Sequence, residues 1–189
     1  MDTFKKQLNY EIKCQPLADK VYNKLYGGYI KRYDWDDTYG REMQRRDIDV
    51  SLGGNNHTIL SISEKFRRDD YGDFLIEVYS MYPRIDGWGR TSQADLYAYF
   101  VPNKLYMVST WAVRRFMEEY RSNIDQEISH MINTGMSRTT IWIKDVLCEL
   151  IKIPTITNGK SWEGICLSIN WDDLEKFNIK YNFYAINWK

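Results

Sequence analysis

The chain has 189 residues, a length that a single domain with one sizeable core accommodates. Hydrophobic residues make up 43% and charged residues 28% of it, which excludes a disordered, collagen-like or coiled-coil chain. The 26 basic and 26 acidic residues cancel, so any contact with nucleic acid must depend on a local basic patch.

Two further features bear on where the protein works. The three cysteines are far apart and lack the spacing of a zinc site or a disulfide framework, which favours free thiols in a reducing compartment. The N-terminus has no apolar export segment, and Pro102 and Lys104 interrupt the most apolar later stretch, residues 96–113. We therefore expect a cytoplasmic protein with no membrane span.

The first predicted elements are a helix and a β-hairpin. Apolar residues recur at helical spacing over residues 16–32, although Gly27 and Gly28 weaken the helix near its end. Apolar and polar residues then alternate over residues 48–52 and 58–67, on either side of a glycine- and asparagine-rich turn at residues 53–56. That pattern is typical of a hairpin with one buried face.

The rest of the chain mixes strand and helix patterns. We expect a central strand at 74–81, strands at 96–101, 105–108 and 164–169, helices at 111–120 and 123–132, and an ambiguous segment at 141–151. No linker or repeat divides the chain, so residues 1–189 are predicted to form one domain. The fold class is α/β, with a mixed β-sheet flanked by helices.

The register of the hairpin decides which side chains share a face. The apolar pattern is matched when Val50 lies opposite Leu60 and Ile48 lies opposite Ile62. The core face then collects Ile48, Val50, Leu52, Leu60, Ile62 and Phe66. The opposite, polar face collects Asp47, Asp49, Ser51, Ser61, Ser63, Lys65 and Arg67.

Asp49, Lys65 and Glu77 are the candidate site residues. Glu77 is the one charged residue within 74–81, and it meets Asp49 and Lys65 if that strand lies beside the hairpin. Two carboxylates and one ammonium group on a partly buried face need a compensating charge, which a divalent cation supplies. Mg²⁺ binds one or two carboxylates together with a phosphate. The pattern therefore favours phosphodiester hydrolysis with Mg²⁺ or Mn²⁺ held by Asp49 and Glu77.

Five segments carry a resemblance to a known family. They are residues 42–50, 62–67, 74–80, 87–89 and 94–100. Together they resemble the restriction-endonuclease-like, or PD-(D/E)XK, nuclease superfamily, in particular its small phage and bacterial members. The resemblance implies a restriction-endonuclease-like core over residues 17–110. Residues 111–189 would then be an extension that completes the core or recognises a partner.

The resemblance also implies roles for the site residues. In this family an Asp after the first helix, an acidic residue two positions before a Lys, and that Lys hold Mg²⁺ and activate water. Asp49 and Lys65 match the first and last of these, but Ser63 stands at the middle position. Three alternatives follow. Glu77 supplies the missing ligand from a neighbouring strand, or Glu64 supplies it if a β-bulge moves its side chain to the other face of its strand. In the third, the protein no longer cleaves nucleic acid.

Two functions are therefore expected from the sequence. The first is a Mg²⁺- or Mn²⁺-dependent nuclease acting on nucleic acid, with DNA favoured over RNA. The second is a catalytically inactive protein of the same fold that binds a protein or a nucleic acid. The aromatic excess permits a homodimer, which is common among relatives of this kind. Gln44 and Glu42 either support the site from just upstream or, as we expect, are exposed loop residues. Glu64 is expected to point away from Lys65, toward the core face or its edge, with Arg46 as its candidate partner.

Overall fold

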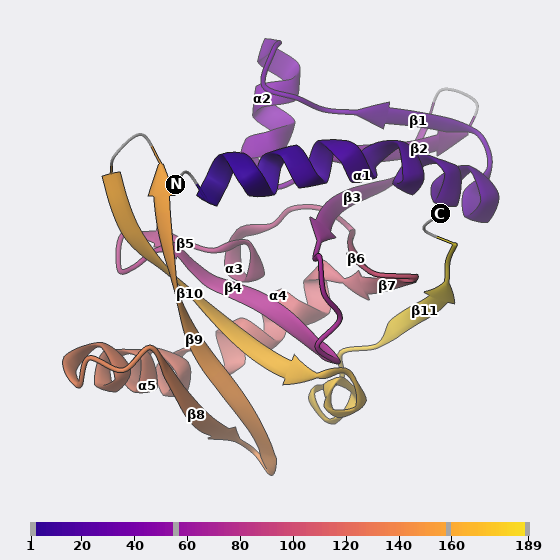
Figure 1. Ribbon diagram of the computed structural model, residues 1–189. Helices are drawn as coiled ribbons and strands as arrows, with labels where there is room; N and C mark the ends of the chain where they lie inside the picture. The colour runs from indigo at the N-terminus through magenta and orange to yellow at the C-terminus, as the bar shows by residue number, and fades with distance from the viewer. Residues whose placement is uncertain (1–2, 55–56, 158–159, 188–189) are drawn as a thin grey trace. The chain divides into compact units, whose positions relative to one another are not determined.

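The computed structural model describes residues 3–54, 57–157 and 160–187 (Figure 1). The fold is mixed α/β, as predicted, but it contains two β-sheets flanked by helices. The sheets belong to two compact units. The N-terminal unit comprises residues 5–70, 92–111 and 181–187, and the C-terminal unit comprises residues 71–91 and 112–180 together with residues 3–4.

The sheet of the N-terminal unit has six strands in the order β1-β2-β3-β6-β7-β11. Its strands are β1 (Tyr29–Arg32), β2 (Val50–Gly54), β3 (His57–Phe66), β6 (Leu96–Val101), β7 (Lys104–Ser109) and β11 (Tyr181–Ala185). β3 and β6 are parallel, whereas the other neighbours are antiparallel. The strands predicted at 96–101 and 105–108 are confirmed in β6 and β7. β1 and β11 were not predicted.

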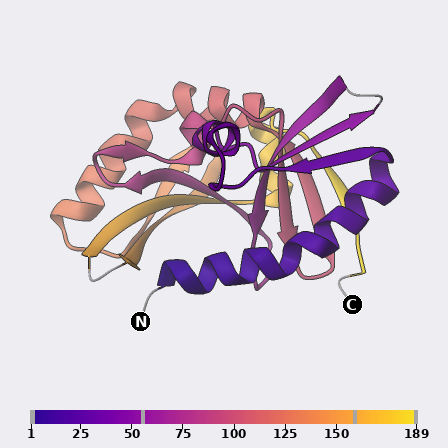
Figure 2. The ribbon, with the colours of Figure 1, turned by 90° about the horizontal axis from the view of Figure 1, so that it is seen from above.

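The helix α1 (Thr3–Tyr26) packs against this sheet. Cys14, Ala18 and Tyr22 follow one another at four-residue spacing and form a buried stripe, which joins a core cluster with β-strand residues such as Val50 and Ile62. Figures 1 and 2 show α1 running beside the strands of its own unit. The prediction of one helix over 16–32 is wrong at both ends, because α1 begins earlier and residues 29–32 form β1.

The end of α1 has a local cause. Gly27 and Gly28 have φ values of 63° and 88°, in the left-handed region that glycine adopts without a steric penalty. A helix cannot continue through that conformation, so the chain turns at the two glycines and enters β1. The sequence therefore indicated a weak point at the two glycines, but the prediction wrongly continued the helix past them and missed β1.

The predicted hairpin is formed by β2 and β3, with a different register. Ser51 lies opposite Ser61, and Val50 lies opposite Ile62 rather than Leu60. The register also shifts between Leu52 and Gly53. A displacement of two residues leaves every side chain on its predicted face, because side chains alternate with a period of two. The asparagines of the predicted turn, residues 55–56, lie outside the described residues.

The sheet of the C-terminal unit has the order β5-β4-β10-β9-β8. Its strands are β4 (Asp73–Met81), β5 (Ile85–Asp86), β8 (Arg138–Ile143), β9 (Val146–Thr157) and β10 (Lys160–Asn170), and all neighbours are antiparallel. β4 lies between two strands, as predicted for a central strand. The ambiguous segment 141–151 divides between β8 and β9, and the late strand is confirmed in β10.

The remaining helices complete the two units. They are α2 (Thr38–Arg45), α3 (Trp88–Thr91), α4 (Thr110–Glu119), α5 (Arg121–Asn133) and the 3₁₀-helix η1 (Trp171–Phe177). α4 and α5 confirm the helices predicted over 111–120 and 123–132. None of the helices in the described part of the chain combines the length and the apolar character needed to cross a membrane.

Candidate functional site: a carboxylate cluster beside Lys65

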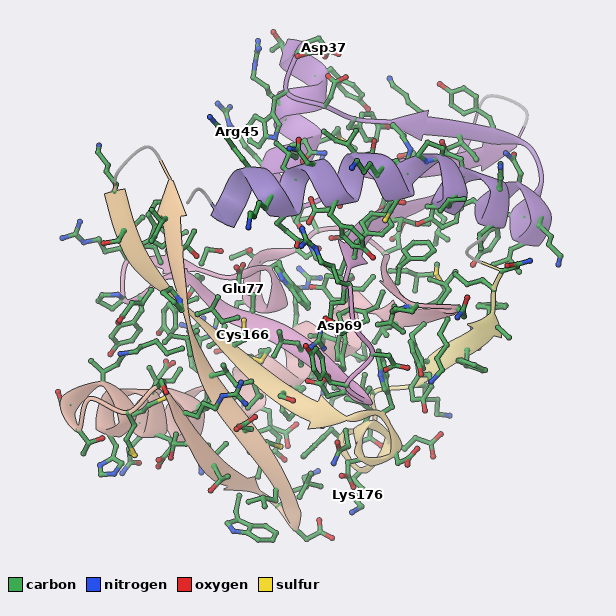
Figure 3. All side chains as sticks on the ribbon, viewed as in Figure 1. Asp37, Arg45, Asp69, Glu77, Cys166 and Lys176 are labelled. Carbon is green, nitrogen blue, oxygen red and sulfur yellow. The ribbon has the colours of Figure 1, made fainter. Side chains whose placement is uncertain are left out.

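The candidate site begins where α2 ends. Asp37 caps the first turn of α2, since its Oδ1 accepts a hydrogen bond from the Gly40 N–H at 2.7 Å (Figure 3). At the other end, the Asp47 N–H donates to Gln44 O and the Ile48 N–H to Met43 O, each at 3.0 Å. These two bonds close the helix with Asp47 in the left-handed conformation that glycine usually provides there.

The side chain of Asp47 links two residues of β3. The φ of Asp47 is 57°, a conformation that costs a residue with a Cβ atom about 1 kcal/mol relative to glycine. Its Oδ2 accepts from Ser63 Oγ and its Oδ1 lies next to Lys65 Nζ, both at 2.7 Å. Ser63 and Lys65 reach the same carboxylate because they lie two positions apart on one face of the strand. The polar face predicted from the hairpin pattern is confirmed here.

Asp49 is held at four points. Its N–H donates to Ile62 O, and its carbonyl accepts from the Tyr33 N–H, both at 2.9 Å. In the side chain, Oδ2 accepts from the Glu64 N–H at 2.7 Å and Oδ1 accepts from Gln44 Nε2 at 3.0 Å. The carboxylate is thus oriented by two neutral donors, and no described residue forms a direct salt bridge with it.

Gln44 has a defined role in this arrangement. Its Nε2 donates both to Asp49 Oδ1 and to Tyr33 O, the latter at 2.8 Å. The expectation of an exposed loop residue is wrong, because Gln44 lies on α2 and its side chain fixes Asp49. No helix was predicted over residues 38–45, and helix formation is what turns Gln44 toward Asp49.

The site concentrates negative charge. Burial raises the pKa of Asp49, the positive charge of Lys65 opposes that rise, and the charge of Asp47 adds to it. Burial also raises the pKa of Glu11 on α1, while hydrogen bonding to Gln7 and the charge of Lys65 lower it and the charge of Asp49 raises it. Glu11, Asp47 and Asp49, which we call the carboxylate cluster, therefore share one neighbouring ammonium group.

Glu11 was not predicted as a site residue. It lies within a long helix whose sequence shows nothing unusual at that position, and only the packing of α1 brings it within electrostatic range of Asp49 and Lys65. Its Oε1 accepts from Gln7 Nε2 at 3.0 Å, and the same nitrogen donates to Phe66 O. These bonds tie the first turns of α1 to the end of β3.

Glu64 points away from Lys65, as predicted, but it does not pair with Arg46. Its Oε2 lies 2.6 Å from an Arg32 guanidinium nitrogen, and its Oε1 accepts from Tyr22 OH at 2.9 Å. Arg46 instead donates from Nε to Gln93 Oε1 at 2.8 Å. Arg32 lies on β1, the strand that the sequence did not predict. The pairing therefore gives the carboxylate of Glu64 a structural role on the core side of β3.

Glu77 lies in the C-terminal unit, on β4 opposite Cys166 of β10 (Figure 3). Its Oε2 accepts from Ser80 Oγ at 2.6 Å and from the Trp88 N–H at 3.3 Å. The assumption that its strand neighbours the hairpin is wrong, because the neighbours of β3 are β2 and β6. The structure thus brings Asp49 near Lys65, whereas the assignment of Glu77 as a metal ligand stays a prediction.

The donor set of the N-terminal unit suits a hard divalent cation. Carboxylate oxygens are the ligands that Mg²⁺ prefers, and one or two of them are enough when waters and a phosphate fill the other positions. Among residues 3–54, 57–157 and 160–187, no three His, Cys, Asp or Glu side chains are already arranged around one metal-sized point.

Comparison with known proteins returned no match. No family model, no curated protein and no solved structure matches the chain. The resemblance to PD-(D/E)XK nucleases therefore stays a prediction, and the function has to be argued from the site itself.

Proposed function

We propose that the protein hydrolyses phosphodiester bonds in nucleic acid, DNA in preference to RNA, in a reaction that depends on Mg²⁺ or Mn²⁺. The observation that carries this proposal is the orientation of Asp49. Two neutral donors, the Glu64 N–H and Gln44 Nε2, hold its carboxylate beside Lys65 without neutralising it. A carboxylate that is fixed in place but uncompensated is suited to binding a cation.

The chain's own groups divide the work between them. A bound divalent cation supplies Lewis-acid polarisation of the phosphate and a water of lowered pKa. Asp49 binds the cation through its carboxylate. Lys65 carries an ammonium group with three donors, which can hold the attacking water or a phosphate oxygen once it moves from Asp47. Gln44 and the Glu64 N–H keep Asp49 in the orientation that binding requires.

The architecture of the N-terminal unit is consistent with a restriction-endonuclease-like core. Its sheet is mixed, with Lys65 on β3, Asp49 directly before β2, and α1 packed against the sheet. Asp49 follows the first two helices, and Lys65 lies on the strand paired with β2, which agrees with the order of the family motif. The core proposed from the resemblance, residues 17–110, includes all of β2, β3, β6 and β7, and also β4 and β5 of the C-terminal unit.

A second function is favoured by one specific observation. Lys65 pairs with Asp47 at 2.7 Å, and Ser63 supplies a hydroxyl where the family motif has an acid. An inactive protein of the same fold, which binds a protein or nucleic acid without cutting it, would have both features.

The deciding experiment is a cleavage assay with single- and double-stranded DNA and RNA in the presence of Mg²⁺ or Mn²⁺. Asp49→Asn and Lys65→Met should each lower the rate roughly 100-fold or more. Asp36→Asn and Lys13→Met change exposed residues of the same types and should cut like the unaltered protein. Cleavage that survives both site substitutions contradicts the proposal, and binding without cleavage by the unaltered protein supports the inactive alternative.

A further inference from the structure

The proposed nuclease reaction raises the question of which carboxylate assists Asp49. A single Asp holds Mg²⁺ weakly, and a second acid improves the site. In the N-terminal unit, three acids lie within range of Asp49 or Lys65: Glu11, Asp47 and Glu64. Their partners distinguish them.

Glu64 is already neutralised. Its carboxylate binds the guanidinium of Arg32 through both oxygens, at 2.6 and 3.2 Å, and the Tyr22 hydroxyl occupies it further. Its side chain is 3% exposed, on the core side of β3. Turning it toward Lys65 would bury the charge of Arg32 without its main partner, which is costly.

Asp47, unlike Glu64, lies on the polar side of β3 and is partly exposed. Its carboxylate lies on the polar side of β3, 2.7 Å from Lys65 Nζ and 2.7 Å from Ser63 Oγ, and its side chain is 23% exposed. An Asp or Glu at position 63 would place its carboxylate beyond the Cβ atom of that residue, in the region where Asp47 now meets the Ser63 hydroxyl. The backbone at position 47 has a φ of 57°, which glycine would adopt more easily than Asp, so the backbone does not require an Asp there. The acid therefore contributes through its side chain.

We infer that Asp47 supplies the carboxylate that position 63 lacks, so that Asp47 and Asp49 together bind the divalent cation and Lys65 lies beside it. This inference rests on the proposed metal-dependent function and names its second ligand. Ser63 then acts as a positioning residue, because its hydroxyl donates to Asp47 Oδ2 and holds that carboxylate over β3.

The test measures Mn²⁺ binding directly, by the loss of the free-ion signal in electron paramagnetic resonance, and needs no cleavage. Asp47→Gly is the main variant, because glycine adopts the left-handed conformation freely and the fold should be retained. We expect it to weaken Mn²⁺ binding roughly tenfold or more. Adding Ser63→Asp to Asp47→Gly should restore binding, because the carboxylate returns from β3 itself. Asp36→Asn should bind like the unaltered protein.

The outcomes separate the inference from the function on which it rests. If Asp49→Asn abolishes Mn²⁺ binding but Asp47→Gly does not, the inference is wrong and the metal-dependent function stands. If Glu11→Gln weakens binding and Asp47→Gly leaves it intact, Glu11 is the second ligand and the inference is again wrong. If Asp49→Asn binds Mn²⁺ like the unaltered protein, the proposed function itself fails.

Discussion

In the C-terminal unit, Arg90 is enclosed by partners, whereas in the N-terminal unit Lys65 is the cation next to three carboxylates. Arg90 lies 2.6 Å from Asp125 and 3.1 Å from Asp86, and its guanidinium stacks over the Tyr79 ring. Arg121 lies 3.5 Å from Asp86 and 3.2 Å from Glu118, so three acids meet two bases. Each of these three carboxylates has a guanidinium partner, whereas the buried Arg90 Nε has no hydrogen-bond partner among the described residues.

The carboxylate cluster of the N-terminal unit has a different balance. Glu11, Asp47 and Asp49 are three acids, and Lys65 is the base that their interactions share. Of the three, Asp49 has no direct salt bridge to any described residue. The comparison shows how two charged clusters can be told apart. A charged group that is held in place but has no partner of opposite charge is a candidate binding site, whereas a group whose charge is paired has a structural role.

The largest expected effect tests the structural side of this comparison. Arg90→Met should lower the free energy of unfolding by about 3 kcal/mol, because it leaves Asp86 and Asp125 without their main partner. This value already includes a reduction for the partial exposure of the two carboxylates. Urea titration measures the change. Arg138→Met, which breaks the exposed pair with Glu149, is the control and should change stability by less than about 0.5 kcal/mol. Equal effects would remove the distinction between enclosed and exposed charges.

A cation should stabilise the site unit almost as strongly. Mn²⁺ at 100 times its dissociation constant should raise the free energy of unfolding by about 2.7 kcal/mol, because it binds the folded site and not the unfolded chain. In Asp49→Asn the same addition should have no effect, since the carboxylate held by Gln44 and Glu64 is lost. Urea titrations with and without MnCl₂ decide the matter. Equal stabilisation of both proteins would show that the cation binds elsewhere.

Tyr22→Phe tests the network behind β3. The phenol is buried and donates to Glu64 Oε1, so its removal should cost about 2 kcal/mol, the usual value of a hydrogen bond to a charged group. Burial, and then the charge of Glu64, raise the pKa of Tyr22. The unfolded chain ionises near pH 10 and the folded chain only above it, so stability should fall as the pH rises past about 10.

The control for this network is Tyr29→Phe, which removes an exposed hydroxyl. Urea titrations of both variants at pH 8 and pH 10.5 give the two comparisons. The pH-dependent loss should be smaller in Tyr22→Phe than in the unaltered protein and unchanged in Tyr29→Phe. A loss of equal size in all three proteins would mean that other groups cause the alkaline instability.

The smallest effect concerns Glu77. Gln keeps the size of the side chain but offers one acceptor in place of a carboxylate, so Glu77→Gln should weaken the bonds from Ser80 and Trp88 and cost about 1 kcal/mol. Mn²⁺ affinity should be unchanged. A loss of affinity comparable to that of Asp49→Asn would instead establish Glu77 as the ligand that the sequence predicted.

Close approach of the backbone explains one further element of the C-terminal unit. A Cβ atom on Gly87 would lie 2.4 Å from Glu77 O, and one on Gly89 would lie 2.3 Å from a methyl group of Ile76. The two glycines therefore allow α3 to pack directly on β4. The strand that requires glycine at these positions was visible only in the fold.

The sequence by itself determined which side chains share a face of the hairpin. Alternation along 48–52 and 58–67 placed Asp47, Asp49, Ser63 and Lys65 together, and the two-residue error in register did not disturb this, because faces repeat with a period of two. Such periodicity is local, and every residue that defines it lies within a few positions.

Only the tertiary structure decided which elements surround that face. β3 pairs with β6, β4 pairs with β10, and α1 brings Glu11 toward Lys65, all across long separations in the chain. These neighbours are selected by the burial of whole faces and by pairings such as Arg32 with Glu64, which no local pattern encodes. Glu77 was therefore joined to the wrong sheet, whereas Asp49 and Lys65 were placed correctly.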